Sequence, residues 1–140
     1  MSSEEKRSWV YLVVGVGVAA VYLVTVLSKL PGADVTRIAY VRPMLVAIGA
    51  GIGLGIVASI AAAIASPRGE AGRTDERDRQ IHRRGEYVGF YVMSVAATVP
   101  LALAMAEAAH FWIANALYLA FVLAMVASST TKIVSYRRGF

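Results

Sequence analysis

The chain alternates long apolar runs with short polar segments. Four uncharged runs lie at about residues 9–27, 43–65, 87–106 and 111–131. Each has roughly twenty residues, and a helix of that length, rising about 1.5 Å per residue, crosses a hydrocarbon core of about 30 Å. Val is common in these runs, but a lone strand in lipid would leave its backbone groups unpaired, so helices are expected. The pattern predicts an all-α, integral membrane four-helix bundle with a single membrane domain over residues 1–140.

Breaks in the apolar pattern indicate where the spans begin, bend and turn. Pro31 and Gly32 break the first span into a loop. Pro43 fits as the first residue of the second helix, where its missing N–H costs nothing. Pro100 should kink the third span and free a carbonyl near Ala96. The segment between the last two runs has only four residues, so these spans are expected to form an antiparallel hairpin.

The positions of Lys and Arg predict the orientation in the membrane. If both termini are cytoplasmic, only Lys29, Arg37 and Arg42 of the 14 Lys and Arg residues lie outside. Cytoplasmic segments of membrane proteins hold an excess of these residues. An N-in, C-in topology is therefore expected, and an even number of spans agrees with it.

Composition and charge exclude several classes of function. The net charge is +5, but the excess lies at the ends of the apolar runs, so nucleic-acid binding is not expected. The chain has no Cys, which excludes thiol nucleophiles and thiolate metal sites. No nucleophile with a base and no cofactor motif is present, so we expect neither enzymatic activity nor a cofactor. The four runs also lack the ionisable group that coupled transporters keep within the membrane.

Glycines in the first two spans predict close helix packing. Gly49 with Gly53, and Gly51 with Gly55, form two overlapping registers of small residues four apart, and Gly15 adds a small site in the first span. A phosphate-binding loop would need a preceding strand and a nearby Lys or acidic partner, and neither is present. The sequence leaves open whether the neighbour is the first span, the third span or another copy.

The polar middle of the chain, a predicted cytoplasmic loop at about residues 66–86, has acids and bases at helical spacing. Thr74 is a hydroxyl N-cap candidate, and the acids that follow it suit the positive end of a helix dipole. One helix from about residue 75 to 106 is expected, so that the third span extends into the cytoplasm. Side chains three or four residues apart are expected to pair. The expected pairs are Asp75 with Arg79, Asp78 with His82, His82 with Glu86, and Arg83 with Glu86.

Two interpretations of this segment go beyond a solvated helix. In the first, its charged side chains bind a protein partner. The candidate partner-binding residues are Asp75, Glu76, Asp78, Arg79, His82, Arg83 and Glu86. In the second, Asp78, His82 and Glu86 ligate a divalent cation, but the neighbouring arginines would oppose one. We therefore expect no metal site. Glu107 and His110 form a single E-x-x-H pair in a turn, whereas a di-iron bundle needs two such motifs.

Four short motifs resemble a group of small bacterial membrane proteins. The motifs are DERDRQI at residues 75–81, GEYVG at 85–89, HFWIAN at 110–115 and YRRG at 136–139. Members of the group have four predicted spans and a D-E-R-D type cytoplasmic box, and are often encoded beside small helix-turn-helix regulators. The resemblance implies a location in the bacterial cytoplasmic (inner) membrane and a regulatory or accessory role.

Three hypotheses of function follow. The leading one is a non-enzymatic membrane protein that binds a cytoplasmic protein or another copy of itself through Asp75 to Glu86. The second is an oligomeric channel or exporter for a small solute. Its polar path would use Ser94, Thr98, Asn115 and Ser128. The third is a small accessory subunit of a larger membrane complex, joined through the glycine faces. In all three the spans contact membrane lipid.

Overall fold

The computed structural model describes residues 3–64 and 75–138. In these ranges every regular element is a helix. The helices are α1 (Ser3–Leu27), the short 3-10 helix η1 (Val35–Arg37), α2 (Val41–Ile64), α3 (Glu76–Ala96), α4 (Thr98–Met105) and α5 (His110–Arg138). Four stretches are long and apolar enough to cross a membrane, with α3 and α4 together making the third. The predicted all-α bundle of four membrane-length helical segments is confirmed. Thr74 and residues 66–73 of the predicted loop at 66–86 lie outside the described residues.

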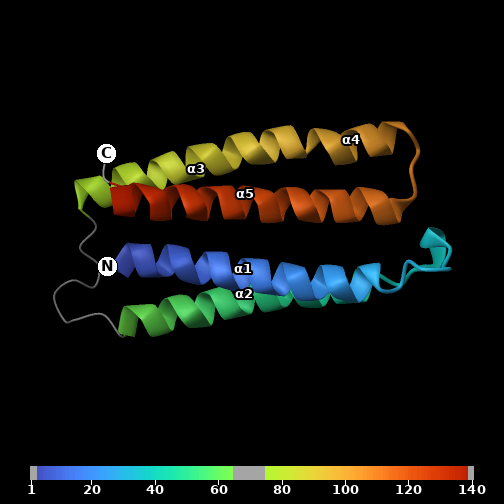
Figure 1. The fold of residues 1–140 in the computed structure, drawn as a ribbon, viewed down its shortest axis with the longest axis horizontal. Coiled ribbons are helices and arrows are strands. Elements are labelled where there is room, and N and C mark those ends of the chain that lie inside the picture. Colours follow the sequence, from blue (N-terminus) through green and yellow to red (C-terminus); the bar gives the residue numbers. More distant parts are fainter. Residues whose placement is uncertain (1–2, 65–74, 139–140) are drawn as a thin grey trace.

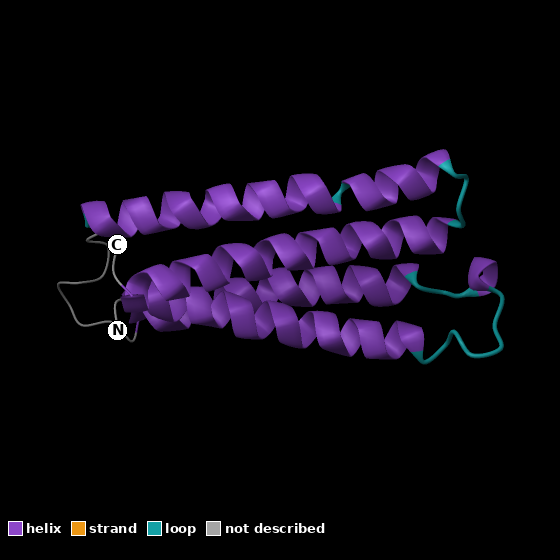
Figure 2. Ribbon diagram, turned by 45° about the horizontal axis from the view of Figure 1, so that its top comes forward, coloured by secondary structure: helices purple, strands orange, loops and turns teal. Residues whose placement is uncertain are grey.

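The helices pack in the order α2, α1, α5 and α3 with α4. α1 and α5 lie side by side in the middle, α2 packs on α1, and α3 and α4 pack on α5 (Figure 1). In the described residues α2 has no substantial contact with α3 or α4. The start of α1 and the end of α5 lie at one end of the bundle, called here the terminal end, and η1 lies at the opposite, loop end (Figures 1 and 2).

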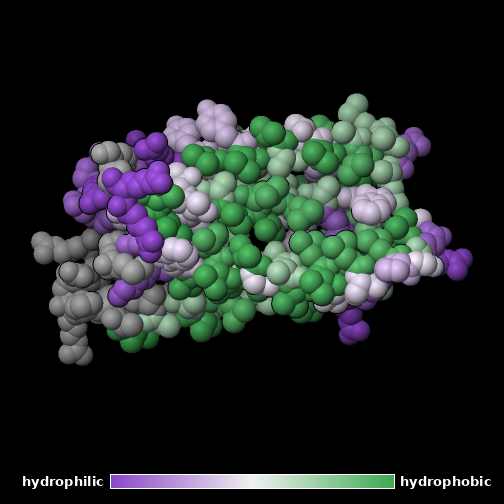
Figure 3. Space-filling view, in the orientation of Figure 1, coloured by the Kyte–Doolittle hydropathy of each residue, from purple (hydrophilic) through white to green (hydrophobic). Residues whose placement is uncertain are grey.

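The surface is apolar over the middle of the bundle. Figure 3 shows a broad hydrophobic band with hydrophilic side chains at both ends. Large side chains within the band are well exposed, for example Val21 and Val24 on α1 and Phe90 on α3. Such a continuous apolar surface is rare on soluble monomers. Lipid chains would cover it without cost, which fits an integral membrane location.

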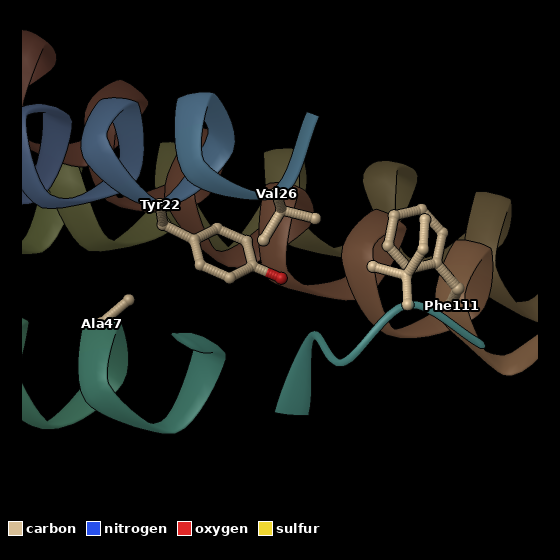
Figure 4. Close-up of a cluster of buried hydrophobic side chains, with 5 residues drawn as sticks. Tyr22, Val26, Ala47 and Phe111 are labelled. Atoms are coloured by element: carbon tan, nitrogen blue, oxygen red, sulfur yellow. The ribbon is translucent and has the colours of Figure 1, made fainter. Parts of the chain in front are cut away.

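A buried cluster near the loop end joins three elements to the connection between α1 and α2. It consists of Tyr22 and Val26 of α1, Ile38 from the connection, Ala47 of α2 and Phe111 of α5 (Figure 4). Two aromatic edge-to-face contacts extend the cluster. The ring centroids of Tyr22 and Tyr118 are 4.7 Å apart, and those of Tyr40 and Phe111 are 5.4 Å apart. The insertion of Ile38 explains why the predicted loop is ordered.

The same connection contains a capped turn. Asp34 precedes η1, and its carboxylate accepts hydrogen bonds from the backbone N–H of Thr36 at 3.0 Å and from the Thr36 hydroxyl at 2.8 Å. These two bonds hold the pKa of the Asp34 carboxyl below its usual value.

A buried hydrogen bond joins α1 and α5 near the loop end. The Tyr22 hydroxyl donates to Asn115 Oδ1 at 2.8 Å, and Asn115 Nδ2 donates to the backbone carbonyl of Phe111 at 2.8 Å. Both side chains are buried. A hydrogen bond between helices specifies their register in lipid, because an unpaired polar group there is costly.

Three helices extend beyond the predicted limits of their spans. α1 begins six residues before Trp9, and buried Glu5 pairs with Arg137 of α5 at 3.6 Å. The Arg137 guanidinium lies 5.5 Å from the centre of the Trp9 ring. α5 continues through the predicted basic tail to Arg138. α2 begins at Val41, so Pro43 is the third helical residue; it is still in the first turn, where the N–H has no intrahelical partner.

The third span is two helices, and the prediction of a single helix over residues 75–106 is wrong. The break is at Ala97, between α3 and α4. Pro100 has no N–H for the carbonyl four residues earlier, so the hydrogen-bond ladder is interrupted near Ala96, as the kink prediction stated. The Thr98 hydroxyl donates to the Val95 carbonyl at 2.7 Å within the same turn.

The Tyr22 hydroxyl is expected to stabilise the bundle. Tyr22→Phe leaves the side-chain oxygen of Asn115 without a donor between α1 and α5. We expect it to lower the free energy of unfolding by about 1 kcal/mol, measured by reversible denaturant titration in mixed micelles. Tyr118→Phe is the control, because Tyr118 contacts Tyr22 through its ring and not through its hydroxyl. Equal losses in both variants would contradict the assignment.

Candidate functional site

The candidate site is the part of α3 at the terminal end, where it lies closest to α5. Gly85 and Gly89 are buried at this contact. A Cβ added at Gly89 would lie 3.1 Å from Ser128 Cβ and 3.2 Å from the Ala124 carbonyl oxygen. The two glycines are four residues apart, which is the spacing of close helix contacts in membranes. This spacing predicted close packing of the second span, and the glycines at 85 and 89 were not among the predicted packing residues.

An ion pair joins the two helices next to these glycines. Lys132 Nζ of α5 lies 2.6 Å from Glu86 Oε1 of α3, and the Ser128 hydroxyl donates to the same oxygen at 3.4 Å. The Lys132 side chain is only 15% exposed, whereas that of Glu86 is 60% exposed. The Lys132 side chain is therefore largely buried, and Glu86 provides its counter-charge.

Two further contacts hold the first turns of α3 against α5. The Tyr136 hydroxyl donates to Asp78 Oδ1 at 3.0 Å. One turn farther along, Ile81 is completely buried. Together with the ion pair, these contacts are spaced at three to five residues along α3. The predicted partner-binding segment is thus packed against the bundle along one face, and does not project alone into solvent.

A capping box begins α3. Asp75 is the N-cap, and its carboxylate accepts from the backbone N–H of Glu76 at 2.7 Å. In return the Asp78 carboxylate accepts from the backbone N–H of Asp75 at 3.3 Å. The N-cap role expected for Thr74 is therefore filled by the next residue. Reciprocal capping of this kind satisfies N–H groups that a helix start otherwise leaves free.

The salt bridges expected within α3 are largely replaced. Arg79 pairs with Glu76 at 3.2 Å instead of Asp75. Asp78 binds Tyr136 and Glu86 binds Lys132, both on α5, and neither His82 nor Arg83 forms a hydrogen bond or ion pair with Glu86 within the described residues. None of the four expected pairs forms in the described part of the chain. Asp78 and Glu86 bind groups on α5, which spacing along one helix could not identify, and Arg79 binds a different acid of its own helix.

A cavity with both polar and apolar lining opens between α1, α3 and α5 beside the ion pair. It has a volume of about 540 Å³, and Tyr11, His82 and Lys132 line it. The same three residues line a smaller adjoining cavity of about 160 Å³, together with Arg7 and Tyr136. His82 therefore faces the cavity. Among residues 3–64 and 75–138, no three His, Asp or Glu side chains are grouped so that they could hold a metal ion.

The outer face of this segment is exposed. Glu76, Arg79 and Arg83 are all exposed, and the pair formed by the first two is the only ion pair on this face in the part of the chain described. Exposed pairs of this kind stabilise a helix by less than about 1 kcal/mol. These side chains are therefore available to a partner at little energetic cost.

The glycines expected to pack helices have different surroundings. Gly15 lies against Met125 of α5, and Gly55 is buried against Tyr11, with a distance of 3.4 Å from an added Cβ to the ring. A Cβ added at Gly49, Gly51 or Gly53 would meet no atom within 4 Å. These three do not contact another helix closely within the described residues, and their packing against another copy stays a prediction.

The polar residues proposed for a solute path are separated in the chain. The Ser94 and Thr98 hydroxyls are exposed and donate to their own helix backbone. Asn115 is buried against Tyr22, whereas Ser128 lies near Glu86. One copy of the protein does not bring these four groups into one path.

The chain matches no protein-family model, no curated protein and no solved structure. The functional argument therefore depends on the geometry of the bundle.

A side chain at Gly89 is expected to separate α3 from α5. Gly89→Val places methyl groups against the Ala124 carbonyl, and we expect a loss of about 1–3 kcal/mol in the free energy of unfolding. Gly53→Val is the matched control, because a Cβ at Gly53 meets open space. Denaturant titration in micelles compares the two. An equal effect at both positions would show that the α3–α5 contact is not tightly packed at Gly89.

The Glu86–Lys132 pair is expected to be coupled. Glu86→Gln leaves the largely buried Lys132 side chain without its counter-charge, and should lower the free energy of unfolding by about 1–3 kcal/mol. Adding Lys132→Met should recover part of this loss, and a double-mutant cycle measures the coupling. The same cycle on exposed Glu76 and Arg79 is the control and should give less than about 0.5 kcal/mol. Equal coupling in the two cycles would contradict the difference in burial.

Proposed function

We propose that this chain is a non-enzymatic integral membrane protein of the bacterial inner membrane, N-in and C-in, with a regulatory or accessory role. In this proposal the outer face of the first turns of α3, formed by Glu76, Arg79 and Arg83, binds a cytoplasmic protein or another copy of the chain. The observation that supports it best is that this charged face is exposed while the opposite face of the same turns is fixed to α5.

The contacts of α3 with α5 reduce the entropic cost of binding through this segment. Asp78, Ile81 and Glu86 hold the backbone of α3 in place before any partner arrives. A surface that is ordered in advance loses less conformational entropy on binding. Only the arginine and glutamate side chains of the outer face then have to adopt a single conformation.

The chemistry of the face favours an acidic protein surface as the partner. Arg83 has no hydrogen bond or ion pair in the part of the chain described, and the sole partner of Arg79 is the exposed Glu76. A guanidinium group can bind a carboxylate through two parallel N–H donors. Glu76 next to these arginines would repel phosphates, which favours a protein over a nucleic acid.

Charge reversal on this face is expected to release the partner. In the double variant Arg79→Glu with Arg83→Glu, two attractions to partner carboxylates are replaced by repulsion between like charges. Binding should weaken at least about tenfold. The measurement is native mass spectrometry of the particle after gentle detergent extraction from its own membrane. Arg138→Glu is the control, because Arg138 is exposed at the same end on α5. If copurifying proteins and oligomeric state are the same in all variants, the proposal is wrong.

A further inference from the structure

An apolar groove lies between α1 and α2, at a distance from the outer face of α3. It has a volume of about 660 Å³ and is lined from Val13 to Thr25 on α1 and from Arg42 to Leu54 on α2. Its lining is almost entirely aliphatic between these limits. Sites of about 300–1,000 Å³ are typical of small-molecule binding.

The length of the groove matches one leaflet of a membrane. The lining residues span twelve positions on each helix, which is about 18 Å at 1.5 Å per residue. Half of a hydrocarbon core is about 15 Å. The groove therefore extends from the interface at the loop end to about the bilayer midplane, which is the depth that an acyl chain of that leaflet occupies.

The groove is narrow compared with a helix. A volume of about 660 Å³ over about 18 Å gives a mean cross-section of about 37 Å². A helix about 10 Å in diameter would occupy roughly 80 Å². An extended alkyl chain therefore fits within the groove, whereas a helix would be seated in it only in part.

A single charge lies at the loop end of the groove. Arg42 is the only charged residue in the lining. It is exposed and has no hydrogen bond or ion pair in the described part of the chain. The other polar groups of the lining are already occupied, since the Thr25 hydroxyl donates to the Val21 carbonyl at 2.7 Å and Tyr22 binds Asn115. An occupant of the groove therefore meets an apolar channel with one cation at its interfacial mouth.

We propose that this groove is a binding site for an anionic phospholipid of the leaflet at the loop end. One acyl chain lies between α1 and α2, and the Arg42 guanidinium binds the headgroup phosphate. Basic pockets between transmembrane helices bind anionic headgroups in this way. The site does not depend on the proposed partner surface, because the two lie on different helices and at opposite ends of the bundle.

Filling the groove tests the acyl-chain part. Gly17 lines the groove and an added Cβ there meets no atom within 4 Å, so Gly17→Leu should occupy the channel without disturbing the fold. Ala20→Leu is the control, because Ala20 is exposed on the same helix but outside the lining. Native mass spectrometry of the delipidated protein, titrated with phosphatidylglycerol, should show binding of the first lipid at least tenfold weaker in Gly17→Leu alone. Equal lipid binding in the two variants overturns the proposal. It is also overturned if the wild-type protein is a dimer that Gly17→Leu dissociates.

Neutralising Arg42 tests the headgroup part. The wild-type protein should prefer phosphatidylglycerol to phosphatidylcholine, and Arg42→Gln should reduce that preference about fivefold, which is the effect of one basic residue at an anionic surface. Lys29→Gln is the control, since Lys29 is exposed at the same end and does not line the groove. Thermal unfolding of each variant checks the fold. A wild-type protein that binds both lipids equally, or an equal loss in the two variants, overturns the proposal.

Discussion

The contact between α1 and α5 is the interaction on which the rest of the structure depends. α2 packs on α1, and α3 and α4 pack on α5, so the two halves of the described chain are joined mainly through these two helices. Lipid offers no hydrophobic driving force for the association of these two helices, because acyl chains are as apolar as the side chains they would replace. Close packing and specific polar contacts must provide it instead. The Tyr22–Asn115 hydrogen bond and the ring contact of Tyr22 with Tyr118 supply both near the loop end.

At the terminal end a second set of contacts determines what the polar segment can do. Gly85 and Gly89 allow α3 to approach α5, and this approach places Glu86 beside Lys132. The ion pair and the Asp78–Tyr136 hydrogen bond then fix the backbone of the charged box. One face of the box becomes structural and the other stays exposed. A helix that is ordered on one side and charged on the other is the basis of the proposed binding role.

The open order of the helices has a consequence for the lipid. Because α2 contacts mainly α1, its flanks are left to the membrane, and the groove between the two helices is accessible along its length. Lipid that enters it would extend the α1–α2 contact and fill a volume that these side chains leave empty. Arg42, at the mouth of the groove, has no ion pair in the described residues. The charge of the lipid headgroup would therefore decide which lipid binds there.

The sequence by itself determined the number of membrane-length helical segments, their approximate limits and the position of the proline kink, because span length and backbone pairing follow from local composition in lipid. Only the tertiary structure decided which polar side chains meet. Helical spacing predicted Asp78 with His82, whereas Asp78 binds Tyr136, 58 positions away in the chain. It drew attention to the glycines of α2, three of which face open space, and missed Gly85 and Gly89. Asp78 and Glu86 bind partners on α5, because burial between helices removes water and strengthens a polar contact there. Arg79, which is exposed, pairs instead with Glu76 on its own helix.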